Sequence, residues 1–140
     1  MMFTKEKIQE VSKELTPFFN ARTQIQLVYL FGSALEDTSY HDVDFAVWCD
    51  EKFAQSAGAF SRVLRWGSEL EPLLKPRKPV DLRFLNDAPV HFRHEVICSG
   101  VVIFEREHDM RVLFEWRVMT EYGDYEPTRR FFNEYLLSGG

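Results

Sequence analysis

Three things are scarce in this sequence: cysteine, long apolar runs and net positive charge. The two cysteines, Cys49 and Cys98, lie far apart in apolar segments, and we expect both to be small buried thiols in a reducing cytosol. No apolar run approaches the roughly 18 residues of a membrane span, and the amino terminus is charged by its fifth residue, unlike an export signal. We therefore expect a cytoplasmic protein with no membrane contact.

The charge balance argues against one class of partner. The chain carries 22 acidic and 17 basic residues, and its net charge of −5 disfavours binding to duplex DNA by phosphate neutralisation. We expect no direct contact with nucleic acid. The hydrophobic content of 45%, with 13 Phe and 3 Trp, supplies core material that a disordered chain would lack. A single domain over residues 1–140 is the expected organisation.

Apolar periodicity and turn signals predict alternating helices and strands. Short apolar runs predict four strands, at 26–31, 43–49, 80–85 and 101–105. Helical spacing predicts helices at 4–21, from Asp50 to Leu70, from about 86 to Ser99, and after 105 with an interruption at 121–127. This order predicts an α/β (α+β) fold in which helices flank a small mixed β-sheet.

Capping residues set the expected helix boundaries. Thr4 is predicted to cap the first helix, Asp50 the second, and either Asn86 or Asp87 the third. The second helix would bury one apolar face, made of Phe53, Ala57, Phe60, Leu64 and Leu70. Residues 33–41 are predicted to form a polar loop.

Two aspartates stand at the start of the second predicted strand. Because strand side chains alternate, Asp42 and Asp44 project to one side, about 6 to 7 Å apart, while Val43 and Phe45 project into the core. Asp81, in the third strand, would join them if the two strands are neighbours in a suitable register. Carboxylates this close repel one another unless a cation compensates them, and Mg²⁺ prefers oxygen ligands. The pattern therefore predicts a site for divalent cations.

A Gly-Ser pair, Gly32 and Ser33, ends the first predicted strand. Glycine allows a phosphate to approach the backbone closely, and the serine offers a hydroxyl and a backbone N–H as donors. An Asp-x-Asp pair alone is common at exposed strand ends. The combination with this Gly-Ser turn, and with a charged Asp81 inside an apolar strand, is far more specific.

These segments resemble a known superfamily. The run LFGSALEDTSYHDVDFAV at 30–47, with VDLRFL at 80–85, is similar to the polymerase-beta-like nucleotidyltransferases and, within them, to the minimal nucleotidyltransferases, or MNT proteins. The resemblance extends to RHEVICSGVVIFE at 93–105 and to a late Tyr-x-Asp at Tyr122 and Asp124. The loop before Asp42 is shorter than is usual in that branch.

The resemblance implies an enzyme that transfers a nucleotide. Asp42 and Asp44 would bind the two Mg²⁺ ions of an ATP complex, and Gly32 and Ser33 would hold its outer phosphates. Asp81 would bind the catalytic metal beside the attacking hydroxyl. MNT proteins are commonly antitoxins paired with a HEPN-domain ribonuclease toxin, so the resemblance also implies that this chain transfers AMP to a hydroxyl, on tyrosine, of such a partner.

Two alternatives stay open. One is nucleotidyl transfer to a small molecule such as an aminoglycoside, for which a chain of 140 residues has little room beside its catalytic domain. The other is a binding-only antitoxin that acts sterically, in which three mutually repelling carboxylates would have no purpose.

Other residues give weaker expectations. A protein partner would dock on the basic loop KPRKP at 75–79 or on the aromatic segment from Trp116 to Tyr135. For His91 and His94 we expect ordinary helix-surface or packing roles, while His41, beside the acids, is a weaker candidate for a contact with phosphate or substrate.

Overall fold

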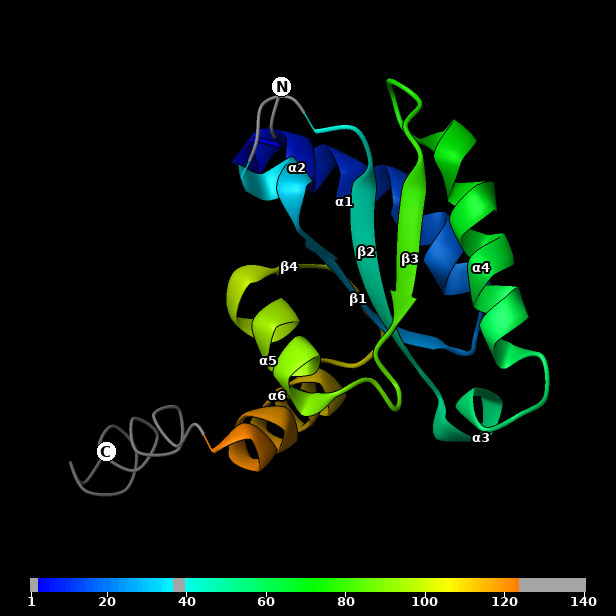
Figure 1. Cartoon of the computed structure of the whole chain (residues 1–140). Helices are drawn as coiled ribbons and strands as arrows, with labels where there is room; N and C mark the ends of the chain where they lie inside the picture. The colour runs from blue at the N-terminus through cyan, green and yellow to red at the C-terminus, as the bar shows by residue number, and fades with distance from the viewer. Residues whose placement is uncertain (1–2, 37–39, 124–140) are drawn as a thin grey trace.

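The computed structural model describes residues 3–36 and 40–123 (Figure 1). The elements in chain order are α1 (Lys5–Ala21), β1 (Ile25–Phe31), α2 (Ser33–Glu36), β2 (Val43–Cys49), α3 (Glu51–Ala54), α4 (Ala59–Leu70), the 3-10 turn η1 (Glu71–Leu73), β3 (Val80–Phe84), α5 (Val90–Ser99), β4 (Val101–Glu105) and α6 (His108–Tyr122). All four predicted strands are confirmed, with boundaries within one residue of the prediction.

The strands form one mixed sheet in the order β3-β2-β1-β4. β1 is antiparallel to both β2 and β4, whereas β2 and β3 run parallel. Because β2 and β3 are parallel, both begin at the same end of the sheet. β1 ends at this same end of the sheet, since it runs antiparallel to β2. The predicted α/β fold with a mixed sheet and flanking helices is confirmed.

Two apolar clusters lie on opposite faces of the sheet. On one face, α1 and α4 pack over Val43, Phe45 and Val47 of β2. On the other face, α5 and α6 pack over Tyr29 and Ala46, and in Figure 1 these two helices lie at the lower left, away from α4. The strands therefore alternate their side chains as predicted, and Asp44 belongs to the face that α5 and α6 cover.

The first two predicted caps are confirmed. Thr4 Oγ1 accepts a hydrogen bond from Lys7 N at 3.1 Å, and Asp50 Oδ2 accepts one from Phe53 N at 3.3 Å. The single helix predicted after Asp50 is wrong, because Gly58 interrupts it with a φ of 81°. Glycine adopts this left-handed conformation readily, and the chain restarts as α4 in a new direction.

The break after α3 also changes which residues of α4 face the core. Ala57, Phe60 and Leu64, predicted to be buried, are exposed. The buried face of α4 consists instead of Ala59, Val63, Trp66, Gly67 and Leu70. The predicted spacing assumed one continuous helix, and an interruption at Gly58 shifts the helical phase.

The predicted cap of α5 is wrong as well. Neither Asn86 nor Asp87 caps this helix, which begins at Val90 without a side-chain cap. The Asn86 side chain instead accepts from Cys49 N and donates to Cys49 O, both at 2.9 Å, and so fastens the end of β2. An amide side chain with a donor and an acceptor can satisfy both backbone groups of one residue.

Three smaller expectations have mixed outcomes. The predicted loop at 33–41 contains the short helix α2, whose Ala34 is fully buried. Cys49 is buried as predicted, but Cys98 is exposed on α5. Residues 37–39 and the predicted helix at 129–137 lie outside the described residues.

No helix in the ranges 3–36 and 40–123 is long and apolar enough to cross a membrane.

Candidate functional site

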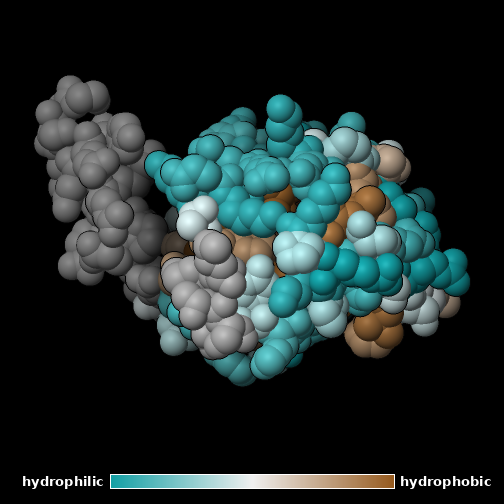
Figure 2. All heavy atoms as spheres, turned by 90° about the horizontal axis from the view of Figure 1, so that it is seen from above, coloured by the Kyte–Doolittle hydropathy of each residue, from teal (hydrophilic) through white to brown (hydrophobic). Residues whose placement is uncertain are grey.

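The predicted site residues meet at one end of the sheet. Gly32 and Ser33 directly follow β1, Asp42 and Asp44 lie at the start of β2, and Asp81 lies at the start of β3. This end is at the top of Figure 1, where α2 stands beside the beginning of β2. Seen from above (Figure 2), it is covered mostly by hydrophilic residues.

The strand register brings two of the aspartates side by side. Asp44 is the pairing partner of Asp81 in β3 and of Phe31 in β1. Since paired residues of neighbouring strands share a face, Asp44 and Asp81 project to the same side of the sheet. The sequence analysis made the meeting of Asp81 with the other acids depend on a suitable register of neighbouring strands, and β2 and β3 have that register.

Burial and electrostatic repulsion both act on the Asp44 carboxyl. Burial raises the pKa of the Asp44 carboxyl, and the charges of Asp42 and Asp81 raise this pKa further. Arg83 and a hydrogen bond from the Ser33 backbone N–H act in the opposite direction but do not cancel the increase. The three carboxylates therefore interact as a group, as predicted from their spacing.

Arg83 is a component that the sequence reasoning missed. Its Nε donates to Asp81 Oδ2 at 3.1 Å. The signal was present, because a residue two positions after Asp81 on the same strand must share its face. Arg83 supplies positive charge to an otherwise acidic edge.

Gly32 also has a structural role that was not predicted. Its φ is 82°, and a Cβ added there would lie only 2.3 Å from Asp44 Oδ2. The carboxylate therefore occupies the space that any other side chain at this position would fill. Together with the Ser33 N–H, this contact fixes the orientation of Asp44. The predicted contact of Gly32 and Ser33 with phosphate stays a prediction.

The donor chemistry of this site fits a hard cation. The acidic side chains offer only oxygen ligands, and their mutual repulsion would be relieved by a divalent ion. In the side-chain arrangement observed, however, no three His, Cys, Asp or Glu residues within 3–36 and 40–123 form a group that could hold a metal. Asp81 is engaged by Arg83 instead.

The KPRKP loop lies near the same end of the sheet. Lys7 Nζ of α1 donates to Lys75 O at 2.7 Å, and Lys78 Nζ lies 5.0 Å from the centre of the Tyr40 ring. Arg77 lies 3.9 Å from Glu71 in an exposed ion pair. The loop thus packs on α1 and on the segment before β2, while its role in docking stays a prediction.

The histidines behave largely as expected. The His94 ring stacks on Tyr122 of α6, with centres 3.7 Å apart and planes 10° apart, which is the packing role predicted for it. His91 and His41 are exposed. The suggested contact of His41 with phosphate stays a prediction, and Asp124 of the Tyr-x-Asp pair lies outside the described residues.

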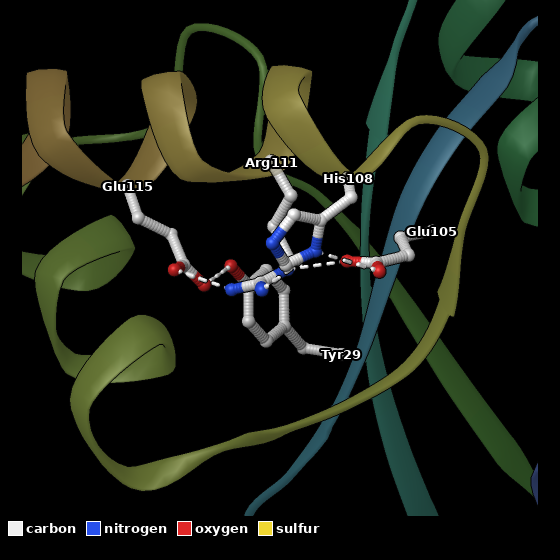
Figure 3. A network of polar contacts seen from close by, with 5 residues as sticks. All are labelled: Tyr29, Glu105, His108, Arg111 and Glu115. Atoms are coloured by element: carbon white, nitrogen blue, oxygen red, sulfur yellow. Dashed lines mark hydrogen bonds and ion pairs between the residues drawn. The ribbon is translucent and has the colours of Figure 1, made fainter.

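A second charged cluster, which we call the polar network, was not predicted. It joins Tyr29 of β1, Glu105 at the end of β4, and His108, Arg111 and Glu115 of α6 (Figure 3). Tyr29 donates to Glu115 Oε2 at 2.5 Å, Arg111 Nη1 to Glu115 Oε1 at 2.7 Å, and Arg111 Nε to Glu105. The network fastens α6 to the sheet.

Titration in the polar network follows from these contacts. Burial, and then the hydrogen bond to Glu115, raise the pKa of Tyr29, so this hydroxyl stays protonated. Partial burial opposes the charged form of Glu105, but the hydrogen bonds from Arg111 and His108 outweigh it and lower the pKa of Glu105. Arg111 is thus shared between two carboxylates.

The comparisons with known proteins agree with this geometry. Residues 13–109 match the family described as polymerase beta, nucleotidyltransferase. No curated protein sequence matches the chain.

Solved structures with a similar fold include chains of three toxin-antitoxin complexes. One complex contains AMP-PNP (TM-score 0.61, 20% identity, covering 90% of this chain and 98% of that one). Another pairs a tri-AMPylated HEPN toxin of Shewanella oneidensis with its MNT antitoxin (TM-score 0.57, 21% identity, 93% and 98% covered). The third is the toxin-antitoxin MntA-HepT (TM-score 0.59, 19% identity, 96% and 99% covered). At these identities the likeness establishes a shared fold.

Proposed function

The chain belongs to the polymerase beta nucleotidyltransferase family, and from this premise we propose that it transfers AMP from ATP to a hydroxyl group of a HEPN-domain toxin and thereby neutralises it. The observation that carries the proposal is the pairing of Asp44 with Asp81, directly beside the Gly32-Ser33 turn. This is the arrangement that the family resemblance required.

The proposed reaction is a displacement at the α-phosphorus of ATP. The acceptor hydroxyl releases its proton to water, its oxygen forms a bond to this phosphorus, the bond to the bridging oxygen of the β-phosphate breaks, and pyrophosphate leaves. Ser33 would donate its hydroxyl to the outer phosphates while its N–H holds Asp44, and Asp81 would lie beside the acceptor hydroxyl. Positioning of the two reactants in line is the main contribution of the protein.

The residues proposed to hold Mg²⁺ are Asp42, Asp44 and Asp81. When bound, two Mg²⁺ ions would offset the charge of the triphosphate and make the acceptor hydroxyl a better nucleophile. For Asp81 to take part, its carboxylate must exchange the guanidinium of Arg83 for the cation. Because Gly32 has no side chain, the Asp44 carboxylate has room to stay in its present position.

The proposed partner is supported by the structural neighbours. Two of these complexes contain AMP-PNP or an AMPylated HEPN toxin, and each matched chain is covered almost completely. Extending the pairing to this chain is our proposal, as is a tyrosine acceptor.

One observation favours a second candidate, a binding-only antitoxin. Arg83 already neutralises Asp81, and the described acidic side chains do not converge on a metal position. In that case the chain would block the toxin sterically, and its aspartates would be dispensable.

The deciding experiment separates the two candidates by mass. The chain is co-expressed with its HEPN partner, the proteins are separated, and the intact mass of the partner is measured. We expect one or more AMP adducts and a loss of RNA cleavage that persists after separation. An unmodified partner, neutralised equally well by the variant Asp42→Asn, would establish steric action instead.

Calorimetry tests the role of the cation. We expect ATP to bind in the presence of Mg²⁺ and to bind much more weakly in excess chelator. Binding of equal strength under both conditions would contradict the two-metal assignment.

A further inference from the structure

Two large apolar residues of α4 face solvent. Phe60 is 65% exposed and Leu64 is 53% exposed. They lie about one helical turn apart, on the side of α4 that does not contact the core. Single exposed apolar residues are ordinary, but two neighbours of this size indicate a surface that another group covers.

These two residues line a groove that reaches the proposed site. The groove, which we call the α4-α5 groove, has a volume of about 530 Å³ and is walled by Phe60 and Leu64 on one side and Phe92 of α5 on the other. Asp81 and Arg83 of β3 also line it. The carboxylate of Asp81 therefore belongs both to the groove and to the acid cluster, the name we give to Asp42, Asp44 and Asp81.

Contacts between α4 and β3 fix the direction of the groove. A Cβ added at Gly67 would lie 3.3 Å from Leu82 Cβ, and Glu71 Oε2 accepts from Val80 N at 3.2 Å. α4 therefore runs antiparallel to β3, so earlier residues of α4 lie farther from Asp81. The helix and strand rises place Leu64 and Phe60 roughly 8 and 14 Å along the groove from Asp81.

We infer that the α4-α5 groove binds the segment of the protein acceptor that carries the reactive hydroxyl, with large apolar side chains of that segment against Leu64 and Phe60. This inference rests on the proposed function. An extended chain rises about 3.3 Å per residue, so these side chains would lie two to four residues from the hydroxyl beside Asp81.

The chemistry of the groove favours a polypeptide over the nucleotide. Its walls are mainly apolar, whereas ATP carries its charge on phosphates that the Gly32-Ser33 turn would hold. A polypeptide can present apolar side chains at fixed distances from a hydroxyl. Because the groove is continuous with Asp81, a segment bound in it would reach the place where the acceptor hydroxyl must arrive. Arg83, which also lines the groove, lies 5.6 Å from the centre of the Phe92 ring.

Kinetics with matched serine substitutions test this inference. Leu64→Ser and Phe60→Ser alter the groove, and Leu73→Ser changes an exposed leucine (39%) that does not line it. With the HEPN partner as acceptor, we expect each groove variant to raise the KM for the partner at least tenfold and to leave the KM for ATP unchanged. Leu73→Ser should behave as the wild type.

Three results would contradict the inference. An unchanged KM for the partner in both groove variants would remove the groove from acceptor binding. A raised KM for ATP would assign the groove to the nucleotide. A wild-type chain that transfers no AMP would contradict the proposed function, and the acceptor groove with it, so the two failures are distinguishable.

A photo-cross-linking experiment locates the occupant directly. Benzoylphenylalanine placed at position 60 should cross-link to the HEPN partner within about four residues of the residue that receives AMP. A cross-link to a second copy of this chain, or to a distant part of the partner, would overturn the assignment.

Discussion

The molecule arranges its charged residues in two contrasting ways. In the polar network, Arg111 lies between Glu105 and Glu115, so each carboxylate has a cation beside it (Figure 3). In the acid cluster of Asp42, Asp44 and Asp81, the guanidinium of Arg83 pairs with Asp81 and acts on Asp44 only through its charge. The pKa of Glu105 is lowered accordingly, whereas the pKa of Asp44 is raised.

This difference separates stabilising residues from functional ones. A carboxylate with a lowered pKa gains stability from its charge in the folded state, and one with a raised pKa loses stability. Asp44 therefore opposes folding, and its placement beside Asp42 and Asp81 makes sense if a ligand compensates the three charges. The following predictions test this contrast, from the largest expected effect to the smallest.

Removing one charge from the acid cluster should affect activity most. We expect Asp44→Asn to reduce AMP transfer by at least about a thousandfold, because a proposed metal ligand is lost. In metal-free buffer the melting temperature should stay equal or rise, since repulsion is relieved. Transfer is measured with α-labelled ATP and melting by circular dichroism.

Asp50→Asn is the matched control for this substitution. It makes the same chemical change in a residue that caps α3, and asparagine caps helices equally well. Transfer should stay within twofold of the wild type. Full activity of Asp44→Asn would remove this residue from the reaction.

Two glycines with nearly equal φ separate backbone strain from site geometry. Gly32 and Gly58 have φ of 82° and 81°, but only at Gly32 would an added Cβ approach Asp44 Oδ2. Both Gly→Ala variants should lose about 1 to 2 kcal/mol of unfolding free energy. Gly32→Ala should also lower AMP transfer by roughly tenfold to a hundredfold, because Asp44 is displaced. Equal activity of the two variants would show that Asp44 does not need its present position.

Breaking the polar network should affect stability and leave catalysis intact. We expect Arg111→Met to lower the unfolding free energy by about 2 kcal/mol, because two carboxylates lose their hydrogen-bonded cation. Tyr29→Phe should lose about 1 kcal/mol. The exposed pair of Arg77 with Glu71 provides the control, and Arg77→Met should change stability by less than about 0.5 kcal/mol. Urea unfolding measures these values, and a large loss of transfer would contradict a purely structural role.

The sequence predicted those features that depend on local pattern. The strands were identifiable because each is a short apolar run, and Thr4 and Asp50 cap helices through residues only three positions away. The acid pair was identifiable because alternation is a property of every strand. The position of Asp81 beside Asp44 was predicted only for the case that the two strands are neighbours in a suitable register. The parallel pairing of β2 with β3 provides that register.

The features that were missed depend on contacts between distant segments. Asn86 was one of two candidate caps, yet its amide binds the backbone N–H and C=O of Cys49, which lies far away in sequence. The packing of Gly32 against Asp44 exists only because β1 and β2 pair. Gly58 gave a local signal, but a regular apolar spacing across it suggested a continuous helix. The polar network brings Tyr29 to α6, which no local pattern indicates.

The smallest expected effect is a difference in pH dependence between the two clusters. The raised pKa of Asp44 means that its contribution to stability is present below the ordinary value of 3.8 and is lost as pH rises through the folded pKa. For Glu105 the sign is reversed: its contribution is present above the ordinary value of 4.5 and is lost as pH falls through the lowered pKa. Relative to the wild type in metal-free buffer, Asp44→Asn should therefore become more stable, and Glu105→Gln less stable, as the pH rises from about 3 to 7. Each difference should stay below about 1 kcal/mol, because both carboxyls are partly solvated. Urea unfolding at a series of pH values measures the two slopes, and slopes of the same sign would contradict the contrast between the clusters.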